Sequence, residues 1–140
     1  MPVLRELGIG LVPFAPLGRG FLAGGVKRSE EYPEEDHRRH DPRFQGTNFD
    51  SNVAAADAVR RVAIAHTATP GQIAIAWLLH QGTDIVPIPG TKRRNHLLEN
   101  VTAASISLTA AELGELAAAL HPSRILGERY NETYMALVDR

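Results

Sequence analysis

A basic segment behind a predicted buried strand is the clearest place for chemistry in this chain. Residues 87–94 read PIPGTKRR, and the pattern predicts a helix beginning at Thr91, with Lys92, Arg93 and Arg94 in its first turn. Cations at a helix N-terminus oppose the macrodipole, at about 0.3–1 kcal/mol each. A bound anion would offset that cost, because free backbone N–H groups and cationic side chains both point at it. The segment therefore indicates a phosphate site, with an exposed basic turn as the alternative.

A glycine-rich segment follows the other predicted strand. Residues 14–24 read FAPLGRGFLAG, in which the glycines let the backbone approach a ligand and Arg19 adds a cation for phosphate. The spacing, Gly18-x-Gly20-x-x-x-Gly24, is one residue longer than the Rossmann fingerprint, and no helical pattern follows at once. The segment is therefore not a Rossmann motif. An ordinary strand-to-loop turn is the alternative to a binding loop.

Other constellations of reactive side chains are weaker. His37 and His40 stand beside Asp36 and Asp41, but no third ligand from a buried element accompanies them. No Ser, His and Asp arrangement typical of nucleophilic catalysis stands out. We therefore expect neither a metal site nor a catalytic residue in the chain.

The elements that position these segments indicate an α/β architecture. Continuous apolar runs at 9–15 and 84–88 predict two buried parallel strands, although each contains a proline. Amphipathic or capped patterns predict four helices: 52–65, 70 to about 82, the one from Thr91, and 109–121. Two strands alone cannot form a covered sheet, so the pattern is that of part of a larger fold.

Charge and composition narrow the function classes. Apolar residues make up 44% of the 140 positions and charged ones 22%, with a net charge of −1 and no cysteine. These values exclude a disulfide framework and a thiolate site, and they favour neither nucleic acid nor membrane as a partner. No apolar run approaches the roughly 18 residues of a membrane span, and no secretory pattern opens the chain, so we expect a cytoplasmic protein. The charge-rich stretch 27–43 predicts a solvated loop.

The two site segments make a family resemblance visible. FAPLGRGFLAG and residues 87–100 resemble the "YSPLGRGFLTG" and "PIPGT…HLxEN" segments of the aldo-keto reductases, which are NADP(H)-dependent (β/α)8-barrel enzymes. The loop 42–49 and the tail 127–130 are similar to the same branch of that family. The resemblance covers nearly all of residues 1–140, in the family's order. It implies the C-terminal part of a TIM barrel, with strands seven and eight and about four helices.

The resemblance also implies a cofactor site. Phe14 takes the place of a tyrosine that stacks on the nicotinamide, and the segment after it borders the pyrophosphate, largely through its backbone. Residues 90–93 would hold the 2′-phosphate of NADP(H), and three positions in the next helix would contact the adenine end. The implied cofactor-binding residues are Phe14, Ala15, Leu17, Arg19, Gly20, Gly90, Thr91, Lys92, Arg93, His96, Glu99 and Asn100.

The family's catalytic Asp, Tyr, Lys and His lie on earlier strands, ahead of everything matched in this chain. The tyrosines Tyr32, Tyr130 and Tyr134 and the two lysines correspond to none of them. We therefore expect a segment of an enzyme that reduces aldehydes or ketones by hydride transfer from NADPH, truncated or split, and inactive by itself. The alternative is a non-catalytic nucleotide-binding or assembly module. Exposed barrel edges would also favour self-association.

Overall fold

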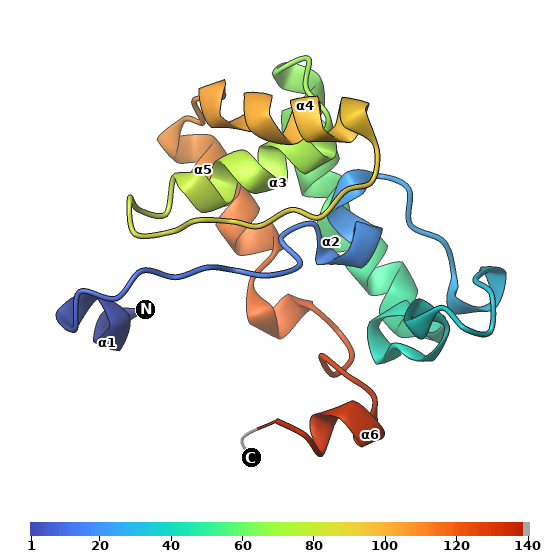
Figure 1. Cartoon of the computed structure of the whole chain (residues 1–140). Coiled ribbons are helices and arrows are strands. Elements are labelled where there is room, and N and C mark those ends of the chain that lie inside the picture. The colour runs from blue at the N-terminus through green and yellow to red at the C-terminus, as the bar shows by residue number, and fades with distance from the viewer. Residues whose placement is uncertain (139–140) are drawn as a thin grey trace.

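The structure is a computed structural model that describes residues 1–138, and helices dominate it (Figure 1). Its α-helices are α1 (Pro2–Glu6), α2 (Gly46–Ala65), α3 (Pro70–Leu79), α4 (Arg94–Thr102), α5 (Ala110–Ala119) and α6 (Glu132–Met135). Its 3₁₀ helices are η1 (Gly18–Ala23), η2 (Ser29–Glu31), η3 (His37–His40), η4 (Pro42–Phe44), η5 (Ala103–Ser105) and η6 (Pro122–Arg124). The four predicted helices are present as α2 to α5.

Two of these helices begin at the predicted capping residues. Thr69 Oγ1 accepts a hydrogen bond from the N–H of Gln72 at 3.3 Å, and the Gln72 side chain accepts one from the N–H of Thr69 at 2.8 Å. Thr109 and Glu112 form the same reciprocal pair at the start of α5. Such boxes satisfy backbone donors that a helix leaves free in its first turn. Both predicted helix starts are therefore confirmed.

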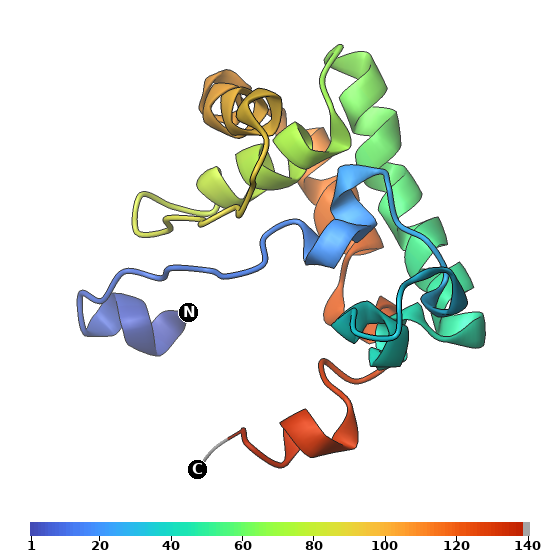
Figure 2. The ribbon, with the colours of Figure 1, turned by 45° about the vertical axis from the view of Figure 1, so that its right-hand side comes forward.

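The hydrophobic core lies where α2, α3 and α5 meet, and α4 lies against α3 (Figures 1 and 2). Val59 and Val62 from α2, Ile73 from α3 and Leu116 from α5 are all buried, and Ile73 has no exposed surface. α1 and α6 stay outside this group of helices in both views. The core therefore fixes the middle of the chain, from which the site segments extend.

The prediction of two strands is wrong, although the two segments do lie parallel and side by side. Within residues 1–138, their pairing consists of two isolated parallel bridges, Leu11 with Ile85 and Phe14 with Ile88. The N–H of Leu11 donates to Asp84 O at 2.7 Å, and Leu11 O accepts from Val86 at 2.9 Å. The next donor along this ladder would be residue 13, which is a proline and has no N–H. Proline therefore limits the pairing to short bridges.

The charge-rich stretch 27–43 forms short 3₁₀ helices over a small aromatic cluster, and is not the solvated loop that its composition predicts. Its Tyr32 is buried with Phe21 and Phe44, whose ring centroids are 4.6 Å apart. Arg38 stacks over the ring of Tyr32 at 4.1 Å, and its guanidinium holds the pKa of Asp36 down to about 2. Charges in this stretch pair with one another above an aromatic cluster, which explains how so polar a sequence folds.

Among the described residues, no single helix has the length and apolar character to cross a membrane. α2 and α3 reach that threshold only when taken as a pair, which is bent by 94°.

The helical core should respond to loss of Ile73 far more than to loss of an exposed isoleucine. We expect Ile73→Ala to lower the free energy of unfolding by about 2–5 kcal/mol, through lost burial and a residual cavity. Ile64→Ala, on α2 with 79% of its surface exposed, should change it by less than about 0.5 kcal/mol. Urea unfolding followed by circular dichroism measures both. Equal effects of the two substitutions would contradict the packing described above.

Candidate functional site

The two parallel bridges bring the two candidate binding segments to the same end of the paired region. The bridge between Phe14 and Ile88 lies at the carboxyl end of both extended segments. The glycine-rich turn leaves directly after Phe14, and the basic segment 90–94 leaves directly after Ile88. Loops at the carboxyl ends of parallel strands form the binding face in barrel and open α/β folds. The two segments therefore leave from the same end of the pairing, although none of residues 90–100 lines the cavity beside Phe14.

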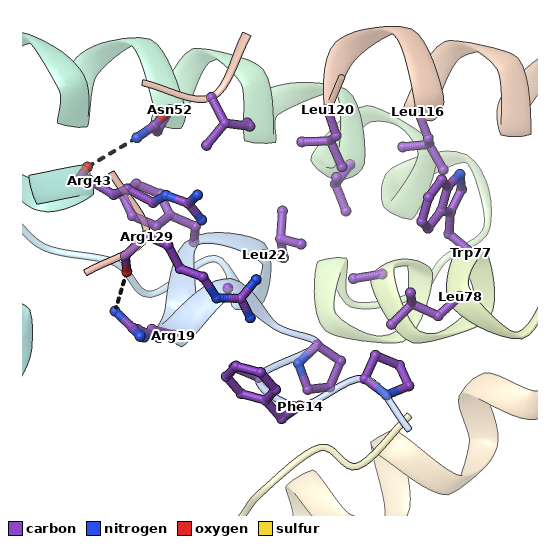
Figure 3. Close-up of a pocket in the computed structure, with 18 of the residues that line it drawn as sticks. Phe14, Arg19, Leu22, Arg43, Asn52, Trp77, Leu78, Leu116, Leu120 and Arg129 are labelled. Atoms are coloured by element: carbon purple, nitrogen blue, oxygen red, sulfur yellow. Dashed lines mark hydrogen bonds between the residues drawn. The ribbon is translucent and has the colours of Figure 1, made fainter. Parts of the chain in front are cut away.

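Phe14 presents a half-exposed aromatic ring at this end. Its side chain is 52% exposed, and it borders a cavity of about 590 Å³ (Figure 3). The guanidinium carbon of Arg129, from the C-terminal tail, lies 4.6 Å from the ring centroid. The opposite wall of the cavity is apolar and includes Trp77 and Leu120. An exposed ring beside a cavity is a surface on which a planar ligand can stack.

The glycine-rich turn holds its backbone in an unusual conformation. Ala15 and Arg19 have positive φ angles of 50° and 56°, which residues other than glycine seldom adopt. The N–H of Gly18 donates to Ala15 O, and that of Gly20 donates to Leu17 O. No hydrogen bond within residues 1–138 uses the N–H of Leu17 or Arg19. These two donors remain available to an anion.

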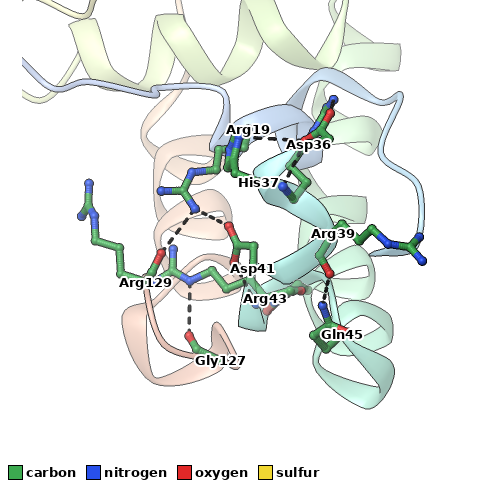
Figure 4. A network of polar contacts seen from close by, with 11 residues as sticks. Arg19, Asp36, His37, Arg39, Asp41, Arg43, Gln45, Gly127 and Arg129 are labelled. Carbon is green, nitrogen blue, oxygen red and sulfur yellow. Dashed lines mark hydrogen bonds and ion pairs between the residues drawn. The ribbon is translucent and has the colours of Figure 1, made fainter. Parts of the chain in front are cut away.

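The side chain of Arg19 has a partner that the sequence did not indicate. Its guanidinium forms an ion pair with Asp41, which is only 3% exposed, and also donates to Arg129 O at 3.4 Å (Figure 4). The ring of Tyr130 lies 5.0 Å away. A buried carboxylate needs such a partner, because an unpaired charge away from water is costly. The Arg19 guanidinium is therefore already paired, and only the backbone N–H of Arg19 is still predicted to bind phosphate.

The same polar network ties the C-terminal tail to α2 and η4. The side chain of Asn52, which is buried, donates to Arg43 O and Leu126 O and accepts from the N–H of Leu126 at 2.9 Å. Arg43 Nε donates to Gly127 O at 3.3 Å, and burial lowers the pKa of this guanidinium. Gly127 has φ +88°, and a Cβ there would lie 2.8 Å from Pro42 O. The tail can pass this point only with glycine.

The basic segment is exposed, and its helix begins three residues later than predicted. α4 starts at Arg94, because Thr91 Oγ1 accepts from the N–H of Arg93 at 3.1 Å and holds the preceding residues in a turn. No side chain caps α4, so the N–H groups of its first turn are free of a capping partner. No ion pair within residues 1–138 involves Lys92, Arg93 or Arg94. Unpaired cations and free N–H groups therefore coincide here.

The three positions predicted for the adenine end lie further along α4. His96 is exposed and approaches Glu99 at 3.6 Å, one turn later on the same helix face. Asn100 is half-buried. Gly90, which precedes the turn, is exposed, and a Cβ there would meet nothing within 4 Å. All twelve predicted cofactor residues thus belong to two segments, around Phe14 and around the start of α4.

Residues that sequence reasoning missed are mainly those that hold the tail. Asp41 and Asn52 carry the network, yet neither stands out locally, since each meets partners far away along the chain. Among the described residues no group of three or more His, Cys, Asp or Glu could hold a metal ion.

Comparisons with known proteins identify the family of the chain. The family model described as "Aldo/keto reductase family" matches residues 1–121, so the chain belongs to that family. The resemblance drawn from the two motifs is therefore confirmed. The chain is 45% identical over 130 residues to the aldo-keto reductase yakc [NADP(+)] of Schizosaccharomyces pombe, with 93% of this chain and 38% of that protein covered. It is 42% identical to a probable aldo-keto reductase 1 of Glycine max, 37% of which it covers.

Solved structures are similar in fold. The glycerol dehydrogenase of Gluconobacter oxydans has a TM-score of 0.77 at 24% identity, over 94% of this chain and 39% of its own. A thermostable aldo-keto reductase in complex with the inhibitor epalrestat has a TM-score of 0.55 at 26% identity, over 84% of this chain and 32% of its own. The chain thus spans somewhat more than a third of the length of the curated relatives it matches. Its fold corresponds to part of a (β/α)8 barrel.

The tail should detach when the Asn52 hydrogen bonds are removed. We expect Asn52→Ala to lower the free energy of unfolding by about 1–3 kcal/mol, because buried backbone groups lose their partners. Trypsin should then cleave faster after Arg124 and Arg129. Ser51→Ala, at the neighbouring position on α2, is the matched control and should behave as the parent chain. Unchanged cleavage in Asn52→Ala would show that this network does not hold the tail.

Proposed function

We propose that this chain provides the nucleotide-binding part of an NADP(H)-dependent aldo-keto reductase that acts on aldehydes or ketones. The observation that carries the proposal is the parallel bridge between Phe14 and Ile88, from which both binding segments leave at the same end. A dinucleotide needs a site for each of its halves. The ring of Phe14 would bind the nicotinamide end, and the cationic start of α4 would bind the adenosine end. The name of the yakc relative, which includes NADP(+), supports this choice of cofactor.

The basic segment would hold the 2′-phosphate of the adenosine. Thr91, Lys92 and Arg93 stand at the uncapped start of α4, where the helix dipole and free N–H groups favour an anion. The cations have no carboxylate partner within residues 1–138, so a phosphate would not have to displace one. Gly90 leaves room for close approach. NAD(H) lacks this phosphate, so the segment favours NADP(H).

The rest of the dinucleotide would run from α4 to Phe14. His96, Glu99 and Asn100 would contact the adenine end. The free N–H groups of Leu17 and Arg19, with Ala15 and Gly20 beside them, suit the pyrophosphate oxygens. Phe14 would stack on the nicotinamide through its exposed face, as a tyrosine would, but without a hydroxyl to donate. These residues would orient the cofactor.

The bound cofactor would supply the hydride, and this chain's residues would position it. We assign none of the twelve site residues the role of the acid that protonates a carbonyl oxygen. The proposal therefore assigns binding and orientation to residues 1–138, and proton donation to groups other than the twelve.

A second candidate function is a non-catalytic nucleotide-binding or assembly module. The observation that favours it is a set of exposed apolar side chains along the two paired segments, each about half exposed: Ile9, Val12, Val86 and Ile88. Such a strip invites contact with another copy or another polypeptide. Because the first proposal also assigns no proton donor to this chain, lack of carbonyl reduction does not separate the two candidates. Burial of these four side chains in a stable oligomer of the chain would favour the second.

Cofactor choice tests the proposal directly. Trp77 is the only tryptophan and borders the cavity, so its fluorescence should fall as NADPH binds. We expect NADPH to bind at least about ten-fold more tightly than NADH, or about 1.4 kcal/mol. Arg93→Ala should remove that preference, whereas Arg124→Ala, at another exposed arginine, should keep it.

Two outcomes would contradict this account. Equal affinity of the parent chain for NADPH and NADH would show that the 2′-phosphate does not bind at the start of α4. Absence of binding by either nucleotide would contradict the whole proposal.

A further inference from the structure

Arg129 occupies a position that the proposed function does not use. Its guanidinium carbon lies 4.6 Å from the centroid of Phe14 and 5.9 Å from that of Tyr130. Figure 3 shows Arg129 reaching in beside the cavity from the side opposite Trp77. A cation at this distance from a ring is attracted to its π-face. Arg129 therefore places a positive charge directly on the ring proposed to receive the nicotinamide.

The backbone of the tail holds Arg129 in this place. Leu126 is bound to Asn52 through both its N–H and its C=O, and Gly127 O accepts from Arg43. Arg129 O accepts from Arg19 at 3.4 Å (Figure 4). These contacts hold the backbone of Leu126, Gly127 and Arg129, and the exposed side chain of Arg129 lies over Phe14. The folded tail thus brings Arg129 to Phe14.

The positive charge on Arg129 is not neutralised nearby. No ion pair within residues 1–138 includes Arg129, and Arg19 already pairs with Asp41, a buried carboxylate that lines the same cavity. Arg43 adds a further cation to the lining. The charged side chains that line the cavity are three arginines (Arg19, Arg43 and Arg129) and Asp41, and the Glu128 carboxylate also acts on Arg43.

We propose that Arg129 makes the site discriminate against the oxidised cofactor, an inference that rests on the proposed stacking of nicotinamide on Phe14. The nicotinamide ring of NADP⁺ carries a unit positive charge, and the dihydronicotinamide ring of NADPH is neutral. The guanidinium lies over one face of Phe14, so the cofactor ring would take the opposite face and feel the charge through the ring. Like charges then repel only in the oxidised state.

The size of the effect follows from charge and exposure. Two unit charges on either side of a half-exposed ring interact in a medium between water and protein interior, which corresponds to about a three-fold to ten-fold change in affinity. NADPH should feel little of this, because its ring has no net charge. Arg129 is therefore a specificity-determining residue for the redox state of the cofactor, and not for its 2′-phosphate.

Calorimetric titration of the 140-residue chain with NADP⁺ and NADPH tests this inference. Arg129→Gln should tighten NADP⁺ binding about three-fold to ten-fold and leave NADPH binding nearly unchanged. Arg129→Lys, which keeps the charge, should retain the parent ratio of the two dissociation constants. Arg124→Gln removes the same charge from an exposed position in the same tail and should leave the ratio unchanged.

The outcomes separate this inference from the proposed function. An unchanged ratio in Arg129→Gln, with both cofactors still bound, overturns the role of Arg129 and leaves the proposed function standing. The same change in Arg124→Gln as in Arg129→Gln would assign the effect to net charge, and overturns it as well. Failure of the parent chain to bind either cofactor overturns the proposed function and this inference together.

Discussion

The short parallel pairing of residues 11–14 with residues 85–88 is the constraint on which the rest of the structure depends. Parallel segments cannot be joined by a tight turn, so the chain between them must cross back, and α2 and α3 form that crossover. The crossover helices pack on α5 and form the core. Because the bridges at Leu11 and Phe14 align the two segments, the glycine-rich turn and the start of α4 emerge together. Every proposed ligand contact follows from that alignment.

A second constraint comes from two buried polar side chains. Asp41 is compensated by Arg19, and Asn52 satisfies backbone groups on both η4 and the tail. Neither could lose its partners without leaving a buried polar group unsatisfied. Together these two side chains hold the C-terminal tail against η4 and α2, so that Arg129 reaches Phe14. The charge around the proposed nicotinamide platform is thus set by residues far from it in sequence.

The helix starts at Thr69 and Thr109 were predictable because a capping box is a local pattern of residues three apart. The extent of the strands was not, since it depends on which N–H meets which C=O, and Pro13 falls where a donor is required. The burial of Asp41 was not predicted, because the sequence around it is rich in charge and does not distinguish one buried carboxylate from its solvated neighbours. Asn52 meets Leu126, 74 positions later, and no local pattern contains that contact. The two cofactor segments were recognisable because family motifs coincide with them.

In the proposed site one dinucleotide contacts both segments, and amide NMR during a titration with NADPH can observe both contacts at once. We expect the amide signals of Leu17 and Arg19 and those of the first turn of α4 to shift together, with one common dissociation constant. Signals from Ala110 and Ala111 at the start of α5, which do not line the cavity, should stay in place. Shifts confined to one of the two segments, or two unrelated dissociation constants, would contradict a shared site built on the Phe14–Ile88 bridge.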